Sequence, residues 1–313
     1  MQSKWKTLIA FGIIYLVWGS TYLAIRVGVA EMPPLVMAAI RFSVAGLAMT
    51  AWALARGERL PSTRQWASVA LLGFLCFLVD YGFLFWAEQR VPSGMAAVIL
   101  ATIPAFTAVS EILWLHTQRL TARLGTALLI GLAGVAVLVD PALRVGGTPV
   151  YLLGAAGLIV GAMSWSTGSV LMRLLPLPAS KVMSAGAQML SGGVLLGLAS
   201  GVLGEVHRFH PAAVSTGAWL ALLYLIVAGS IVSFTAYTWL IHHESPTKVG
   251  TYAYVNPVVA VLIGYLLGGE ALDLRTVLGT VLVIVSVLII TTGKTVKTRS
   301  SAKAAPQLDA ERP

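Results

Sequence analysis

Ten long apolar runs follow one another along the chain, separated by short polar segments. Their ranges are 7–27, 34–55, 66–87, 93–115, 121–139, 151–175, 180–203, 217–241, 246–268 and 274–292. Each approaches or exceeds the roughly 20 residues that a helix needs to cross a bilayer, and none shows the strict alternation of a half-buried strand. Because lipid offers no hydrogen-bond partners to an open backbone, runs of this kind favour helices. The pattern predicts an all-α integral membrane protein with ten transmembrane helices.

Composition excludes a soluble globular protein. Of the 313 residues, 58% are hydrophobic and 11% are charged, whereas soluble domains carry roughly 25% charged residues. The single cysteine, Cys76, lies inside an apolar run; we expect it to pack there, and a lone cysteine excludes a disulfide within the chain. Lys4 and Lys6 precede the first run and no cleavage site follows it, so 7–27 is predicted to remain as the first helix.

The basic residues predict the orientation. With the N-terminus inside, fifteen of the 21 Lys and Arg residues lie on the inner side, five lie on the outer side, and Arg41 falls within a run. An excess of Lys and Arg marks cytoplasmic loops, so both termini are expected in the cytoplasm. The net charge of +9 then follows from topology, and no nucleic-acid partner is predicted. Residues 293–313 are polar and basic, which is typical of a disordered cytoplasmic tail.

Two stretches occur twice, once in each half of the chain. WGSTYLAIR at 18–26 and WSTGSVLMR at 165–173 share a Trp and an Arg eight residues apart. The second copy comes five runs later, and because five is odd, it must enter the membrane from the opposite side. VPSGMAAVILATIP at 91–104 is likewise similar to SPTKVGTYAYVNP at 245–257. Inverted repeats are the architecture of many transporters. The predicted five-helix repeats are 7–139 (helices 1–5) and 151–292 (helices 6–10).

At these residues the chain resembles the EamA family of the drug/metabolite transporter superfamily. The resemblance covers about residues 7–292 and is carried by WGSTYLAIR, RFSVAG at 41–46, VPSGMAAVILATIP, YAYVNPVVAVLIG at 252–264 and GGEAL at 268–272. Within the family the chain is most similar to the YedA-like drug and metabolite exporters. The resemblance implies two inverted five-helix repeats around a central cavity, in a bacterial inner membrane. Gln118 stands where the first repeat usually has Glu, and its counterpart Glu270 lies near a helix end, so no role is predicted for Glu270.

Depth along the helices predicts a binding site. At a rise of about 1.5 Å per residue, Trp18, Trp165 and Asn256 lie about halfway through their runs, where transporters built from inverted repeats hold their substrates. Aromatic faces bind apolar or cationic solutes. The predicted pocket consists of Trp18, Ser20, Thr21, Trp165, Ser166, Tyr252 and Asn256, with Tyr81 and Tyr237 nearer its mouths. The alternative is close-packed helices, in which Ser and Thr bond to their own backbone.

Two prolines and two intramembrane charges carry further predictions. Pro104 and Pro257 remove a backbone hydrogen bond in mid-helix, so they are predicted hinges, with static kinks as the alternative. Arg41 and Asp80 lie at matching depths in neighbouring runs, so a structural ion pair is expected between them. The other interpretation is that Asp80 takes up a proton and couples export to the proton gradient. Arg26 is expected to reach the outer membrane surface with its charged end.

A secondary transporter is favoured over other classes. The prediction is export of small metabolites, amino acids or drug-like solutes by alternating access, with a passive facilitator or an uptake permease as alternatives. An intramembrane enzyme is the rival class, but Ser93 has no mid-span His as a base. The sequence contains no P-loop motif, and no cofactor or metal is predicted. The expected partners are a small-molecule substrate, the lipid bilayer and, under the coupling hypothesis, protons.

Overall fold

The computed structural model describes residues 2–115, 121–144, 149–243 and 252–291, and these residues form helices and short connections without strands. The predicted tail at 293–313 and Gln118 lie outside this part. The helices of the first half are α1 (Gln2–Val29), α2 (Pro34–Ala55), α3 (Thr63–Leu72), η1 (Gly73–Tyr81), α4 (Gly82–Glu88), α5 (Ser93–Leu100), α6 (Ile103–Ser110), η2 (Glu111–Leu115) and α7 (Ala122–Arg144). Those of the second half are α8 (Pro149–Leu171), α9 (Lys181–Val202), α10 (Glu205–Arg208), η3 (Pro211–Ala213), α11 (Thr216–Tyr224), η4 (Leu225–Val232), α12 (Ser233–His243), α14 (Tyr252–Gly268) and α15 (Leu274–Thr291).

The apolar runs form membrane-spanning helices. Seven segments of the described chain are long and apolar enough to cross a bilayer, and they coincide with seven of the predicted runs. The other three runs correspond to α7, α14 and α15, whose apolar stretches are shorter. An all-helical protein with several membrane spans is thereby confirmed.

Three of these spans are not uniform α-helices. The third and the eighth each contain a π-helical segment, η1 and η4, and such segments are frequent at functional sites. In the fourth span α5 ends at Leu100, and α6 begins at Ile103. Pro104 therefore lies in the first turn of a new helix, where its missing N–H removes no hydrogen bond, and not in mid-helix as predicted. Pro257 does lie inside α14.

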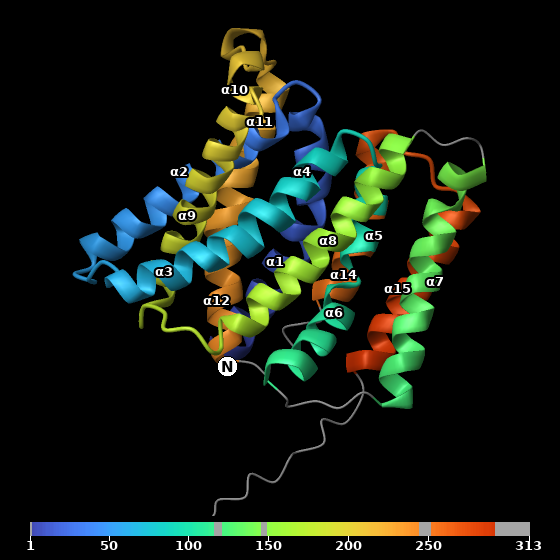
Figure 1. The fold of residues 1–313 in the computed structure, drawn as a ribbon, viewed down its shortest axis with the longest axis horizontal. Coiled ribbons are helices and arrows are strands. Elements are labelled where there is room, and N and C mark those ends of the chain that lie inside the picture. The colour runs from blue at the N-terminus through green and yellow to red at the C-terminus, as the bar shows by residue number, and fades with distance from the viewer. Residues whose placement is uncertain (1, 116–120, 145–148, 244–251, 292–313) are drawn as a thin grey trace, which may run out of the picture.

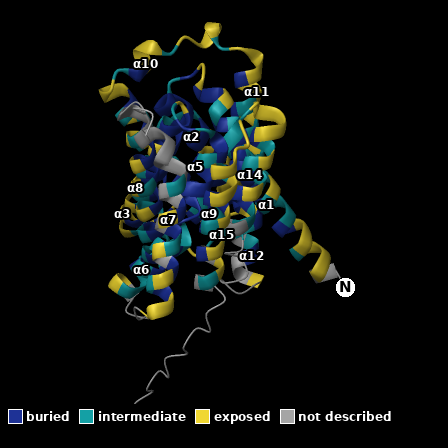
Figure 2. Ribbon diagram, turned by 90° about the vertical axis from the view of Figure 1, so that its right-hand side faces the viewer, coloured by how far each residue is buried: buried dark blue, intermediate teal, exposed yellow. Residues whose placement is uncertain are grey.

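The spans pack as two groups flanked by two pairs. In the α1 group, α1 packs against α11, η4, α12 and α14, and in the α8 group, α8 packs against η1, α4, α5 and α6. α5 also packs against α14 and α1, so it lies where the two groups meet. Two pairs, α2 with α9 and α7 with α15, lie at opposite edges of the bundle (Figure 1). Buried residues gather in the interior of the bundle, while the first turns of α1 project away from it (Figure 2).

Glycines bring α2 and α9 into backbone contact. A Cβ atom on Gly46 would lie 2.4 Å from the backbone nitrogen of Leu190, and one on Gly193 would lie 2.5 Å from that of Ser43. Helices approach this closely in membranes where small residues line both surfaces. The pair therefore forms a tightly packed edge beside the two groups.

Glutamates cap helix N-termini at one end of the bundle, the upper end in Figure 1. We call it the outer end, after the side predicted from the basic residues. The carboxylate of Glu205 accepts hydrogen bonds from the N–H groups of Leu35 (2.8 Å) and Val36 (3.3 Å) at the start of α2. Glu31 accepts bonds from the N–H (2.6 Å) and the hydroxyl (2.7 Å) of Ser215, just before α11. Negative charge is favourable at these positions because of the helix dipole.

Candidate functional site

Trp18 is the centre of an aromatic group in the α1 group of helices. It is buried, and its indole N–H donates to the carbonyl oxygen of Gly229 over 3.1 Å. Its ring lies 5.5 Å from Phe234, 5.3 Å from Tyr237 and 5.1 Å from Tyr252, measured between centroids. Tilted and edge-on contacts at these distances are favourable for aromatic pairs.

Trp165 lies across the bundle, in the α8 group, with its ring centroid 6.0 Å from that of Tyr81. A path of rings connects the two tryptophans: Tyr81 is 5.9 Å from Phe77, and Phe77 is 6.3 Å from Phe234. Among the described residues the tryptophans reach each other through these rings and make no direct ring contact. Tyr81 and Tyr237, predicted nearer the mouths of a pocket, stand beside the tryptophans. We call this set the aromatic cluster; it comprises Trp18, Phe77, Tyr81, Trp165, Phe234, Tyr237 and Tyr252.

The hydroxyl groups of the predicted pocket have protein partners. Thr21 donates to the carbonyl oxygen of Trp18 (2.6 Å), and Ser166 lies within 2.7 Å of the carbonyl oxygen of Ala162 in its own helix. Ser166 also lies 2.9 Å from the carbonyl oxygen of Ile103, so it ties α8 to the interruption between α5 and α6. Hydrogen bonds from Ser and Thr to the backbone of their own helix agree with the alternative of close-packed helices at these positions.

Ser20 and Asn256 connect neighbouring helices beside Trp18. The hydroxyl of Ser20 lies 2.6 Å from that of Tyr224 on α11. Asn256 is buried, and with its amide nitrogen facing acceptors it donates to the carbonyl oxygens of Tyr252 (3.2 Å) and Tyr15 (3.3 Å). Asn256 therefore fastens α14 to α1 at the level of the aromatic cluster.

The predicted ion pair between Arg41 and Asp80 is wrong. The buried Arg41 guanidinium donates from Nε to the hydroxyl of Ser230 (3.0 Å) and lies over the ring of Tyr81, with Cζ 5.2 Å from the centroid. Asp80 is turned toward α8, where a Cβ on Gly161 would lie 3.0 Å from its Oδ1. Within the described chain, Arg41 Nη1 and Asp80 Oδ1 are buried without a hydrogen-bond partner. Position along the helices predicts that the two residues lie at the same depth in the membrane, but it does not predict the direction in which each side chain points.

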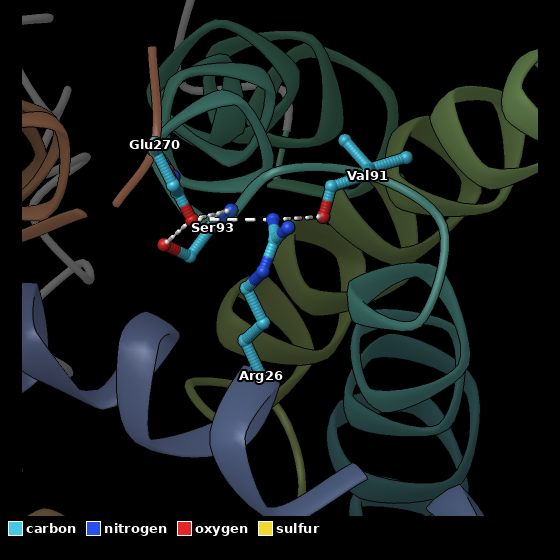
Figure 3. A network of polar contacts seen from close by, with 5 residues as sticks. Arg26, Val91, Ser93 and Glu270 are labelled. Atoms are coloured by element: carbon cyan, nitrogen blue, oxygen red, sulfur yellow. Dashed lines mark hydrogen bonds and ion pairs between the residues drawn. The ribbon is translucent and has the colours of Figure 1, made fainter. Parts of the chain in front are cut away.

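Glu270 is the centre of a network of polar contacts at the outer end (Figure 3). Its Oε1 accepts hydrogen bonds from the N–H (2.9 Å) and the hydroxyl (2.5 Å) of Ser93, and Oε2 accepts one from the N–H of Gly94 (3.1 Å). Arg26 Nη1 forms an ion pair with Oε1 at 3.2 Å and also lies 3.5 Å from the carbonyl oxygen of Val91. We call Arg26, Ser93, Gly94 and Glu270 the Glu270 cluster.

This cluster bears on two expectations. The Glu270 side chain is only 8% exposed, so its place near a helix end does not leave it in solvent. The Arg26 side chain, expected to reach the outer surface, is 39% exposed and also forms the ion pair with Glu270. Gly269 adopts a φ of +63°, and the N–H of Glu270 donates to the carbonyl oxygen of Gly264 (3.0 Å). Glycine reaches such a φ at little cost, so the chain turns back here and directs the carboxylate at α5.

The chain matches a known family along most of its length. The model of the EamA-like transporter family matches residues 5–140 and 152–292. The uncharacterized inner membrane transporter YedA of Escherichia coli (strain K12) is 40% identical over 283 residues, which cover 90% of this chain and 89% of YedA. A chloroplastic WAT1-related protein of Arabidopsis thaliana is 28% identical over 292 residues, covering 92% of this chain and 69% of that protein.

A solved structure shares the fold. A crystal structure with 24% sequence identity superposes with a TM-score of 0.61 and covers 91% of this chain and 96% of its own. Together with the membrane-spanning helices, the family match and the similarity to YedA determine the class of the protein. The chain belongs to the EamA-like transporter family and is a multi-pass inner-membrane transporter of small molecules, not an enzyme.

Proposed function

We propose that the chain exports small metabolites, amino acids or drug-like solutes by alternating access at the aromatic cluster. The observation that carries the proposal is the path of rings between Trp18 and Trp165, because it joins the α1 group to the α8 group inside the bundle. A solute held there would touch both groups, so a rocking motion between them would transfer its access from one side to the other. The aromatic faces favour apolar or cationic solutes.

The packing supports two inverted repeats as the basis of this cycle. The first span of each proposed repeat packs against the third and fourth spans of the other: α1 against α11, α12 and α14, and α8 against η1, α4, α5 and α6. Two of the three π-helical segments of the described chain, η1 and η4, also occur in corresponding spans, the third of each repeat, while η2 lies in the fourth span. Two inverted repeats related by a pseudo-two-fold axis, with both termini in the cytoplasm, would produce this reciprocal packing. Pro257, inside α14, remains a proposed hinge. In the fourth span the proposed hinge is the interruption between α5 and α6, which Pro104 follows at the start of α6.

Proton coupling through Asp80 is the proposed energy source. The support is the buried Oδ1 of Asp80, which has no hydrogen-bond partner among the described residues. A buried carboxylate with an oxygen that lacks a partner is costly to keep charged, so taking up a proton would relieve that cost. Intramembrane carboxylates serve as proton relays in many pumps and transporters.

Inside-out vesicles test both proposals. Vesicles containing the transporter should accumulate labelled amino acids or amphipathic drugs against a gradient, and an uncoupler should abolish the accumulation. Trp18→Ala is expected to reduce it several-fold, because the cluster loses its central ring, while Trp52→Ala, at a side chain 64% exposed on α2, serves as the matched control. Asp80→Asn should leave only equilibration.

Three results would contradict the proposals. Full accumulation by Trp18→Ala, at equal amounts of folded protein, would place the binding site elsewhere. Accumulation that persists in Asp80→Asn would remove the coupling role of that residue. Equilibration by the parent protein, unaffected by the uncoupler, would indicate a passive facilitator.

A further inference from the structure

The Glu270 cluster joins the two groups of helices at the outer end. Arg26 belongs to α1 and Glu270 follows α14, so both lie on the α1 group, whereas Ser93 and Gly94 begin α5 in the α8 group. All three hydrogen bonds accepted by Glu270 in the cluster therefore cross between the groups. A neighbouring bond, from the amide of Gln89 to the carbonyl oxygen of Val29 (3.2 Å), crosses in the same place.

The two other helix-capping glutamates of the outer end make a different kind of contact. Glu205 caps α2 from α10, so its bonds remain within the α2–α9 pair and the turn that follows it. Glu31 follows α1 and bonds to Ser215 at the start of α11, so its contacts remain on the α1 group. These residues share the chemistry of Glu270 but do not join the groups that would move apart.

Glycines on α14 and α5 leave space for the Glu270 carboxylate. A Cβ on Gly264 would lie 2.5 Å from Oε2 of Glu270, so a side chain here would displace the carboxylate from its position over this turn of the helix. A Cβ on Gly94 would lie 3.1 Å from Cα of Val261. The absence of side chains at these glycines lets α5 and α14 meet and places Glu270 at the junction.

We propose that the Glu270 cluster is the outer gate: it seals the transport pathway in this conformation and must break for the pathway to open outward. The inference rests on the proposed alternating access. Hydrogen bonds with an ionised partner are stronger than neutral ones, and they exist here only while the two groups are in contact. The cluster therefore stabilises the outer-closed conformation selectively, and weakening it shifts the population toward the outer-open one.

A buried reporter cysteine tests the gate. In a Cys76→Ala background, which removes the only cysteine, Ala97→Cys places a thiol one helical turn inward of Ser93, at a position 1% exposed. The reporter protein is purified in nanodiscs and its labelling rate with a bulky polar maleimide is measured. Glu270→Gln loses the charge and turns an NH₂ group toward N–H donors, so the rate should rise about tenfold, equivalent to about 1.4 kcal/mol. Arg26→Gln should raise the rate less, because the bonds from Ser93 and Gly94 remain.

Glu205→Gln and Glu31→Gln are the matched controls. Each removes a helix-capping carboxylate at the same end, and neither should change the labelling rate by more than about twofold, since neither contact crosses between the groups. Unchanged labelling in Glu270→Gln, or an equal rise in Glu205→Gln, would overturn the gate. If Glu270→Gln does not give monodisperse protein, Arg26→Gln decides: a rise supports the gate and no rise overturns it.

The gate and the proposed export can fail separately. Faster labelling in Glu270→Gln alone, together with vesicles that accumulate no tested solute, would support the gate and count against the proposed export. Uncoupler-sensitive accumulation together with unchanged labelling in Glu270→Gln would support export and overturn the gate.

Discussion

Replacing Gly46 by alanine should loosen the contact between α2 and α9. The new Cβ would lie 2.4 Å from the backbone nitrogen of Leu190, 2.8 Å from its Cα and 2.8 Å from the carbonyl oxygen of Gly186. Non-bonded carbon contacts lie at about 3.5–4.0 Å, so the helices would have to separate by roughly 1 Å. All three atoms belong to the backbone of α9, so no rotamer change can relieve the clash.

The expected magnitude follows from two opposing terms. Overpacking costs about 1–3 kcal/mol, and the upper part of that range applies because backbone must move. Replacing a helical glycine by alanine returns about 1 kcal/mol of helix propensity. The net loss for Gly46→Ala should therefore be about 1–2 kcal/mol. Gly193→Ala, whose Cβ would lie 2.5 Å from the backbone nitrogen of Ser43, should lose a similar amount.

The assay is the thermal midpoint of the monodisperse size-exclusion peak in detergent. Gly12→Ala is the matched control, because a Cβ there meets nothing within 4 Å and the helix of α1 should gain or keep stability. Gly46→Ala should show a lower midpoint than the parent protein, and Gly12→Ala an equal or higher one. If Gly46→Ala were as stable as Gly12→Ala, the close approach of α2 and α9 would be refuted.

Two further predictions concern the glutamates of the outer end. Glu205→Ala should lower the free energy of unfolding by about 1–3 kcal/mol, because the N–H groups of Leu35 and Val36 lose their acceptor; Glu205→Gln should lose less, and an Ala variant as stable as the parent in the same thermal assay would contradict this. The hydrogen bonds from Ser215 hold the pKa of Glu31 below its ordinary value of 4.5. The folded pKa is the lower one, so this contribution is complete well above pH 4.5 and is lost as the pH falls below that value. The thermal midpoint of Glu31→Gln should therefore fall less between pH 7 and pH 3 than that of the parent, and equal falls would argue against the bond.

The apolar pattern predicts the spans because hydrocarbon leaves the backbone no alternative to a helix. The same pattern does not predict where a span changes from an α-helix to a π-helix. The segments at 73–81 and 225–232 are as apolar as their flanks, yet they are π-helical, since the change in hydrogen bonding depends on packing against neighbouring helices. Depth has a similar limit: Arg41 and Asp80 lie at matching heights, but rotation about the helix axes turns Arg41 toward Ser230 and Asp80 toward Gly161.

The Glu270 cluster is missed for a different reason. A glutamate near a helix end is usually solvated, so position alone favours an interfacial role. The available signal is the small residues on both sides of the contact: Gly264 and Gly269 near Glu270, and Ser93-Gly94 after a proline. Those residues let two helices approach and offer N–H donors, but only the fold shows that the two segments meet.

The distribution of polar contacts suits a protein whose groups must separate and meet again. In the interior, the α1 and α8 groups touch through rings such as Phe77 and Phe234. Thr21 bonds to a carbonyl oxygen of its own helix, and Ser166 bonds to carbonyl oxygens of α8 and α6, both in the α8 group. Apolar contacts lack strict geometry, and breaking them leaves no unsatisfied polar group. At the outer end, Glu270 bonds across the groups where water can replace each lost partner. Directional contacts therefore lie where breaking them is least costly, which is what a reversible gate requires.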